Sequence, residues 1–127
     1  MRFLLQGNFT RAVTDALVRH GHTAQTVGEA VADSAVDTTE LLSLVRKSQQ
    51  DLLTNDKTII QYLLDHSTKL DRSVVYLQLE GGDVEQDDAI DRLFERYSRL
   101  KPGMLYTVTE TRVKIRQLPS SLSSASE

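Results

Sequence analysis

Three carboxylates lie where the chain passes from one predicted element to the next. Asp37 and Glu40 have the spacing of a capping box at a helix start, with Asp in place of the usual Ser or Thr. Asp56 follows a short apolar run and precedes a helical pattern. Each acid is suited to capping a helix, which is the favoured interpretation, or to metal binding or general-base catalysis. Mg²⁺ and Mn²⁺ prefer oxygen ligands, so these acids predict a metal site only if the fold brings them together.

Other common catalytic chemistries have no support in the sequence. The chain has no cysteine, which excludes disulfides, thiolate nucleophiles and cysteine-ligated metal centres. His20, His22 and His66 lie near predicted helix ends, where capping at the surface is favoured over zinc ligation. No Gly-x-Ser-x-Gly motif, P-loop or dinucleotide fingerprint is present.

The spacing of apolar residues predicts alternating strands and helices. The predicted strands are 1–5, 23–27, 51–54, 73–79, 104–108 and 112–118. The predicted helices begin after caps at Asn8, at Asp37 and at Asn55 or Asp56, and a fourth follows the turn at 80–83 and extends to Leu100. Residues 28–36 are predicted to form a loop with at most one turn of helix.

This order of elements predicts an α/β fold with a mainly parallel sheet, helices on both faces and a C-terminal antiparallel hairpin. Ligands of such sheets bind outside the carboxyl ends of the strands. That rule selects residues 6–8, 54–56 and 80–83, and the helix that begins at Asp37 is a further candidate for the same cleft.

Composition indicates one soluble, cytoplasmic domain. The 127 residues suit a single domain at 1–119, followed by a Ser-rich tail at 120–127 that we expect to be flexible. We expect no membrane segment and no signal peptide, because apolar runs are short. The net charge of −3 combines an acidic stretch at 80–95 with a basic stretch at 96–118. The basic hairpin is suited to contacting phosphates, although protection of a sheet edge is favoured, and a homodimer is a further possibility.

Several ordered segments together resemble the small bacterial PIN-like proteins, which are related to PIN-domain nucleases and to the ribonuclease toxins of toxin–antitoxin systems. The resemblance covers residues 1–119 and rests on the ordered set of the segments Phe3-Leu4-Leu5-Gln6-Gly7-Asn8, His20-Gly21-His22, Val36-Asp37-Thr38-Thr39-Glu40-Leu41-Leu42, Thr54-Asn55-Asp56-Lys57-Thr58-Ile59, Val74–Leu79 and Arg112–Pro119. It implies a three-layer α/β/α domain that uses clustered acids and Mg²⁺ or Mn²⁺ to cleave RNA.

The resemblance also implies roles for individual residues. Asp56 is the implied main metal ligand, and Asp37 and Glu40 are the implied secondary ligands or the base that activates water, so that all three acids would be catalytic. The implied substrate contacts are Asn8, Gln6, Thr54 and Lys57, with Lys57 next to a phosphate. An antitoxin-like protein is the implied partner of a toxin.

The chain departs from the family pattern at three positions that are acidic in PIN-like proteins. They are occupied here by Gln6, Gly7 and Thr58. Because divalent-metal affinity depends on the number of charged ligands, these changes predict a weakened or inactive ribonuclease. The alternative hypothesis is a non-catalytic module that binds a protein partner or nucleic acid.

Overall fold

The computed structural model describes residues 1–30, 37–68 and 70–119, so the predicted tail and most of the predicted 28–36 loop lie outside the described residues. The strands are β1 (Arg2–Gln6), β2 (Thr23–Thr26), β3 (Asp51–Thr54), β4 (Val74–Leu77), β5 (Met104–Val108) and β6 (Val113–Gln117). The helices are α1 (Arg11–Arg19), α2 (Val27–Ala30), α3 (Thr38–Ser48), α4 (Lys57–Asp65) and α5 (Asp83–Arg96). No helix in the described ranges has the length and apolar character needed to cross a membrane.

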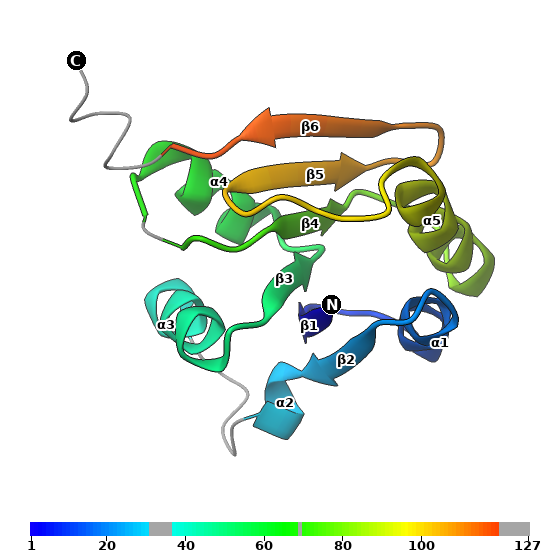
Figure 1. Ribbon diagram of the computed structural model, residues 1–127, viewed down its shortest axis with the longest axis horizontal. Coiled ribbons are helices and arrows are strands. Elements are labelled where there is room, and N and C mark those ends of the chain that lie inside the picture. Colours follow the sequence, from blue (N-terminus) through cyan, green and yellow to red (C-terminus); the bar gives the residue numbers. More distant parts are fainter. Residues whose placement is uncertain (31–36, 69, 120–127) are drawn as a thin grey trace.

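The strands form one six-stranded sheet in the order β2-β1-β3-β4-β5-β6 (Figure 1). β1 to β5 are parallel, and β6 pairs with β5 in the antiparallel direction. The mainly parallel sheet and the C-terminal hairpin are therefore confirmed. The chain moves from β1 outward to β2, and from β3 it moves outward on the opposite side. The carboxyl ends of β1 and β3 therefore meet at a topological switch point, where α/β proteins commonly bind ligands.

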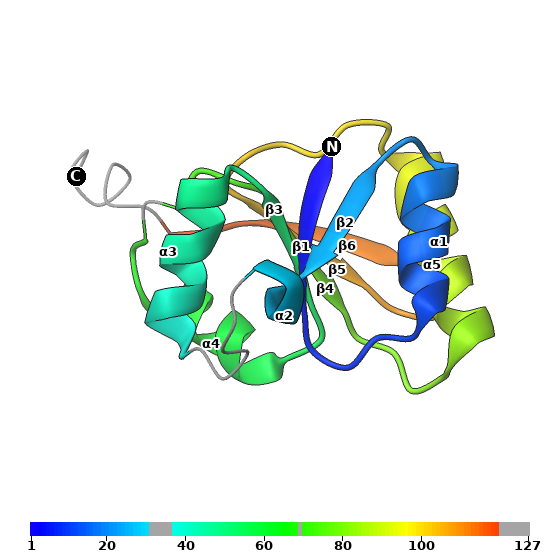
Figure 2. The same ribbon diagram turned by 90° about the horizontal axis from the view of Figure 1, so that it is seen from below.

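Each face of the sheet carries its own apolar core. Phe3, Leu53 and Val75 pack with residues of α1 and α5, whereas Leu4 and Leu52 pack with residues of α3 and α4. Figure 2 shows these two helix pairs on opposite sides of the strands. Successive strand residues point to opposite faces, so strands covered on both sides become continuous apolar runs. This explains why Phe3-Leu4-Leu5 and Leu52-Leu53 lack alternation.

Two predicted helix boundaries are wrong. α1 is capped by Thr10, whose side chain accepts a hydrogen bond from Ala12 N–H, and not by Asn8. α5 ends at Arg96, because Tyr97 is extended, and does not continue to Leu100. Leu100 is nevertheless buried, and Lys101 N–H donates to the Tyr106 hydroxyl at 2.8 Å. The apolar spacing thus continues past the helix into a packed loop.

Of the two histidines after α1, His20 caps the helix as predicted, whereas His22 does not. His20 is the C-cap of α1, and its Nε2 lies 2.7 Å from an Asp91 carboxylate oxygen. The His22 ring packs on Phe94 with centroids 4.4 Å apart, and its Nδ1 accepts a hydrogen bond from the Met1 amino group at 2.8 Å. Burial, and then the nearby positive charge of the amino group, lower the pKa of His22 below its ordinary value.

The lowered pKa of His22 predicts a pH-dependent stability. Below about pH 6.5 the unfolded chain binds more protons than the folded chain at this residue. We therefore expect the free energy of unfolding in urea to decrease between about pH 7.5 and about pH 5.5, a range in which ordinary carboxylates stay ionised. His22→Gln removes this titration and should flatten the dependence. If the free energy of unfolding of His22→Gln depended on pH as strongly as that of the unmodified protein, the pH dependence could not be assigned to His22.

Candidate functional site

The candidate site begins with a hydrogen bond between the last residues of β1 and β3. Gln6 lies opposite Thr54 in the parallel register. The Thr54 hydroxyl donates to Gln6 Oε1 at 2.6 Å, and Thr54 is fully buried. A neutral amide therefore occupies the end of β1, and its oxygen already accepts a hydrogen bond from the neighbouring strand.

A second pair of hydrogen bonds joins the loops that follow these strands. Asn8 N–H donates to Asn55 Oδ1 at 3.3 Å, and Asn55 Nδ2 donates to the Asn8 carbonyl at 2.9 Å. Gly7 allows this close approach: its φ is +122°, and a Cβ at this position would overlap Asn55 Oδ1. The two loops that sequence analysis selected are thus brought together, and their contact is made by neutral groups.

Asp56 is held at the start of α4. Its carboxylate accepts a hydrogen bond from Thr58 N–H at 2.9 Å, while its own N–H donates to the Thr54 hydroxyl at 3.0 Å. The predicted N-cap at Asp56 is confirmed. Lys57, next along the chain, is exposed.

Asp37 and Glu40 form the predicted cap at the start of α3. The Asp37 carboxylate accepts a hydrogen bond from Glu40 N–H at 2.8 Å, and both residues are exposed. Within the described ranges, no group of three or more His, Asp or Glu side chains is placed to hold a metal ion. The structure therefore joins Gln6, Asn8, Thr54 and Asp56 at the switch point, but it does not combine Asp37, Glu40 and Asp56 into a three-acid metal group.

The donors at the switch point do not fit a Mg²⁺ or Mn²⁺ centre. Gln6 and Asn55 offer neutral amide oxygens that already accept hydrogen bonds, and Asp56 is the acid held at this position. Hard divalent cations bind weakly where carboxylates are few, because each charged oxygen contributes strongly to the affinity. The arrangement is better suited to holding two loops in a fixed shape than to activating water.

Two hollows flank Asn8. A cavity of about 470 Å³ lies on the β2 side and is lined in part by Gln6, Gly7, Asn8, Thr10, Arg11 and Thr26. A smaller hollow of about 70 Å³ lies on the β4 side and includes Asn55, Gly81 and Gln86. The third predicted segment, 80–83, therefore adjoins the site through Gly81.

Two residues that support this site, Thr10 and Gln86, were not predicted from the sequence. Gln86 is buried, and its Oε1 accepts hydrogen bonds from Thr10 N–H at 3.0 Å and from the Thr10 hydroxyl at 3.1 Å. Gln86 lies four residues before Ile90, on the side of α5 that otherwise carries apolar residues. A single polar residue at an apolar position of a predicted helix is the sequence signal that could have identified Gln86. Its contact with Thr10 also explains why α1 begins after Thr10.

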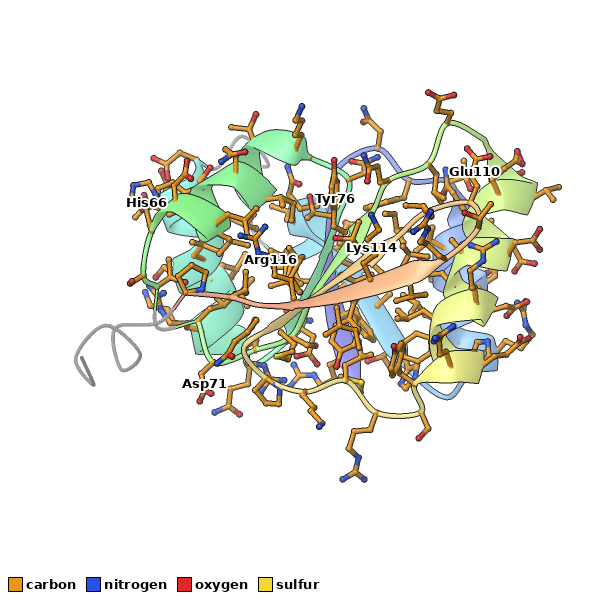
Figure 3. The ribbon with its side chains drawn as sticks, turned by 90° about the horizontal axis from the view of Figure 1, so that it is seen from above. His66, Asp71, Tyr76, Glu110, Lys114 and Arg116 are labelled. Carbon is orange, nitrogen blue, oxygen red and sulfur yellow. The ribbon has the colours of Figure 1, made fainter. Side chains whose placement is uncertain are left out.

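A row of polar side chains leads from the switch point across the sheet. Adjacent strands place its members opposite one another: Gln6, Thr54, Tyr76, Thr107 and Lys114. Figure 3 shows the Tyr76 and Lys114 members of this row. The row connects the switch point with the exposed edge strand β6.

Comparison of the chain with protein-family models, with curated proteins and with solved structures finds no match.

Proposed function

We propose that this chain is a three-layer PIN-like domain that binds a partner and does not cleave RNA through a metal centre. The observation that supports this proposal is that uncharged groups make the contacts at the switch point. Thr54 donates a hydrogen bond to Gln6 at 2.6 Å, and Asn8 and Asn55 exchange two hydrogen bonds. Two of the three residues at the positions that the resemblance predicts to be acidic take part in this contact: Gln6 accepts the hydrogen bond from Thr54, and Gly7 lets Asn55 approach. The order of elements and the hairpin support the PIN-like assignment.

A nuclease assay on the full chain tests this proposal. Labelled RNA and single-stranded DNA are incubated with the protein in Mn²⁺, in Mg²⁺ and in EDTA, and calorimetry measures Mn²⁺ binding. We expect no metal-dependent cleavage and no saturable Mn²⁺ site. Asp56→Asn keeps a good helix cap and should behave like the unmodified protein.

Asp65→Asn is the matched control, since it makes the same charge change at the opposite end of α4. Mn²⁺-dependent cleavage that Asp56→Asn removes and Asp65→Asn preserves would overturn the proposal. That result would support the ribonuclease hypothesis and would assign Asp56 to a metal site.

A further inference from the structure

The strand β6 ends the sheet with an unpaired side. In the described part of the chain, no strand lies beyond β6. The Arg112 carbonyl accepts a hydrogen bond from Thr109 N–H, and Leu118 N–H donates to the Gly103 carbonyl. The even-numbered residues of β6 therefore direct their backbone groups inward, toward β5. In an antiparallel ladder the alternate residues face the other way. The N–H and C=O groups of Val113, Ile115 and Gln117 therefore face outward along the edge.

The two faces of β6 carry different side chains. Arg116 lies opposite Leu105, which belongs to the core on the α4 side, and Lys114 shares that face. Ile115 lies opposite Tyr106, which belongs to the other core, and it is 39% exposed. Figure 3 shows Lys114 and Arg116 along β6. The edge thus presents basic residues on one face and an exposed apolar residue on the other.

The positive charges on this edge have no acidic partners in the described ranges. Lys114 and Arg116 are exposed and take part in no ion pair there. The nearby Glu110 accepts a hydrogen bond from Glu80 N–H instead. A second copy paired through β6 would place these basic side chains opposite one another, and like charges across strands are destabilising. The charges therefore favour an acidic occupant over a second copy of this chain.

We infer that β6 binds an extended protein segment in which acidic and apolar residues alternate, added as a further antiparallel strand. The inference rests on the proposed function, for which it names the partner. Outward backbone groups at Val113, Ile115 and Gln117 hydrogen-bond the incoming strand. Positions opposite Lys114 and Arg116 are non-hydrogen-bonded pairs, where Cα atoms approach to about 4.5 Å and acidic side chains meet the basic ones closely. Apolar residues of the segment cover Ile115.

A protein segment that alternates acidic and apolar residues matches more features of the β6 edge than nucleic acid does. A phosphate backbone would contact Lys114 and Arg116, but it offers no ladder of amide groups to the outward backbone and no apolar residues to Ile115. An alternating segment satisfies the charges, the backbone and the apolar side chain together.

The test uses a synthetic peptide that alternates Glu and Val, titrated into the ¹⁵N-labelled full chain in EDTA. We expect amide shifts centred on β6 and slowed amide exchange at Val113, Ile115 and Gln117. Lys114→Glu with Arg116→Glu should weaken binding about tenfold or more, because attraction becomes repulsion. A Lys–Val peptide should then bind this variant better than the unmodified protein. The double variant Lys114→Gln with Arg116→Gln removes the two positive charges without reversing them, and it measures the loss of peptide binding that follows from the lost attraction alone.

Arg46→Glu with Lys47→Glu is the matched control, since it makes the same charge change in the last turn of α3. An equal loss of binding in this control, shifts away from β6, or no binding of the Glu–Val peptide would overturn the inference. So would an RNA oligonucleotide that binds through Lys114 and Arg116 when the peptide does not, or sedimentation showing a dimer with protected β6 amides. Because no metal is present, these outcomes are separate from the nuclease assay.

Discussion

Replacing Asp51 by alanine is expected to lower the free energy of unfolding by about 3 kcal/mol. Asp51 begins β3 with a side chain only 6% exposed, and its Oδ1 lies 3.4 Å from Arg72 Nε. The same carboxylate accepts a hydrogen bond from Ser73 N–H at 3.0 Å. Arg72 Nη2 also donates to Asp51 Oδ2 at 3.5 Å, so the variant leaves the guanidinium and Ser73 N–H without their acceptor. Urea unfolding measures the loss.

Two comparisons separate the charge of Asp51 from its hydrogen bond. Asp51→Asn keeps an acceptor for Ser73 N–H and should lose less stability than Asp51→Ala. Adding Arg72→Leu to Asp51→Ala should recover part of the loss, because the unpaired guanidinium is removed. A loss from Asp51→Ala no larger than that from Asp65→Ala, at an exposed acid on α4, would contradict this account.

The second large effect is expected at Gly7, where alanine should cost about 2 to 3 kcal/mol of unfolding free energy. Its φ of +122° disfavours any side chain, and the added Cβ would overlap Asn55 Oδ1. The two hydrogen bonds between Asn8 and Asn55 would then be displaced. Thermal and urea unfolding measure the stability, and NMR shifts of the Asn55 side-chain amide report the loss of the contact.

Gly21→Ala is the matched control for Gly7→Ala. Gly21 also has a positive φ, of +83°, but nothing lies within 4 Å of a Cβ built there. It should cost about 1 kcal/mol, from backbone strain alone. Equal losses at the two glycines would show that the Asn55 contact contributes nothing. The result also bears on the proposed function, because an acidic residue at position 7 would meet the same obstacle.

Local signals predicted the helix caps that depend on neighbouring residues. Asp37 and Asp56 each accept a hydrogen bond from an N–H two or three residues ahead, so their roles follow from short spacing. Asn8 has an equally good cap sequence, yet its backbone groups bond Asn55. Thr10 caps α1 instead and is also held by Gln86. Because Asn55 and Gln86 are far from Asn8 and Thr10 in the chain, the local spacing of residues does not indicate these contacts.

The pattern of apolar residues likewise predicted α5 but not its end. Leu93, Tyr97 and Leu100 keep a helical spacing, although the helix ends at Arg96. Leu100 is buried from a loop, and the Tyr97 and Tyr106 rings make an edge contact at 5.6 Å. Burial alone sets the apolar pattern, so it does not distinguish a continuing helix from a packed loop.

The sequence by itself determined the strands and the longer helices apart from some of their ends, the antiparallel hairpin and the segments at the carboxyl ends of the strands, because periodicity, caps and turns act over a few residues. Only the tertiary structure decided the strand order that joins Gln6 to Thr54, and that leaves Asp37, Glu40 and Asp56 without a three-acid metal group. It also decided that the face of β6 that carries Lys114 and Arg116 lies on the side of the sheet covered by α3 and α4. Strand order follows from how both faces of the sheet are covered, and that depends on contacts between residues far apart in the chain.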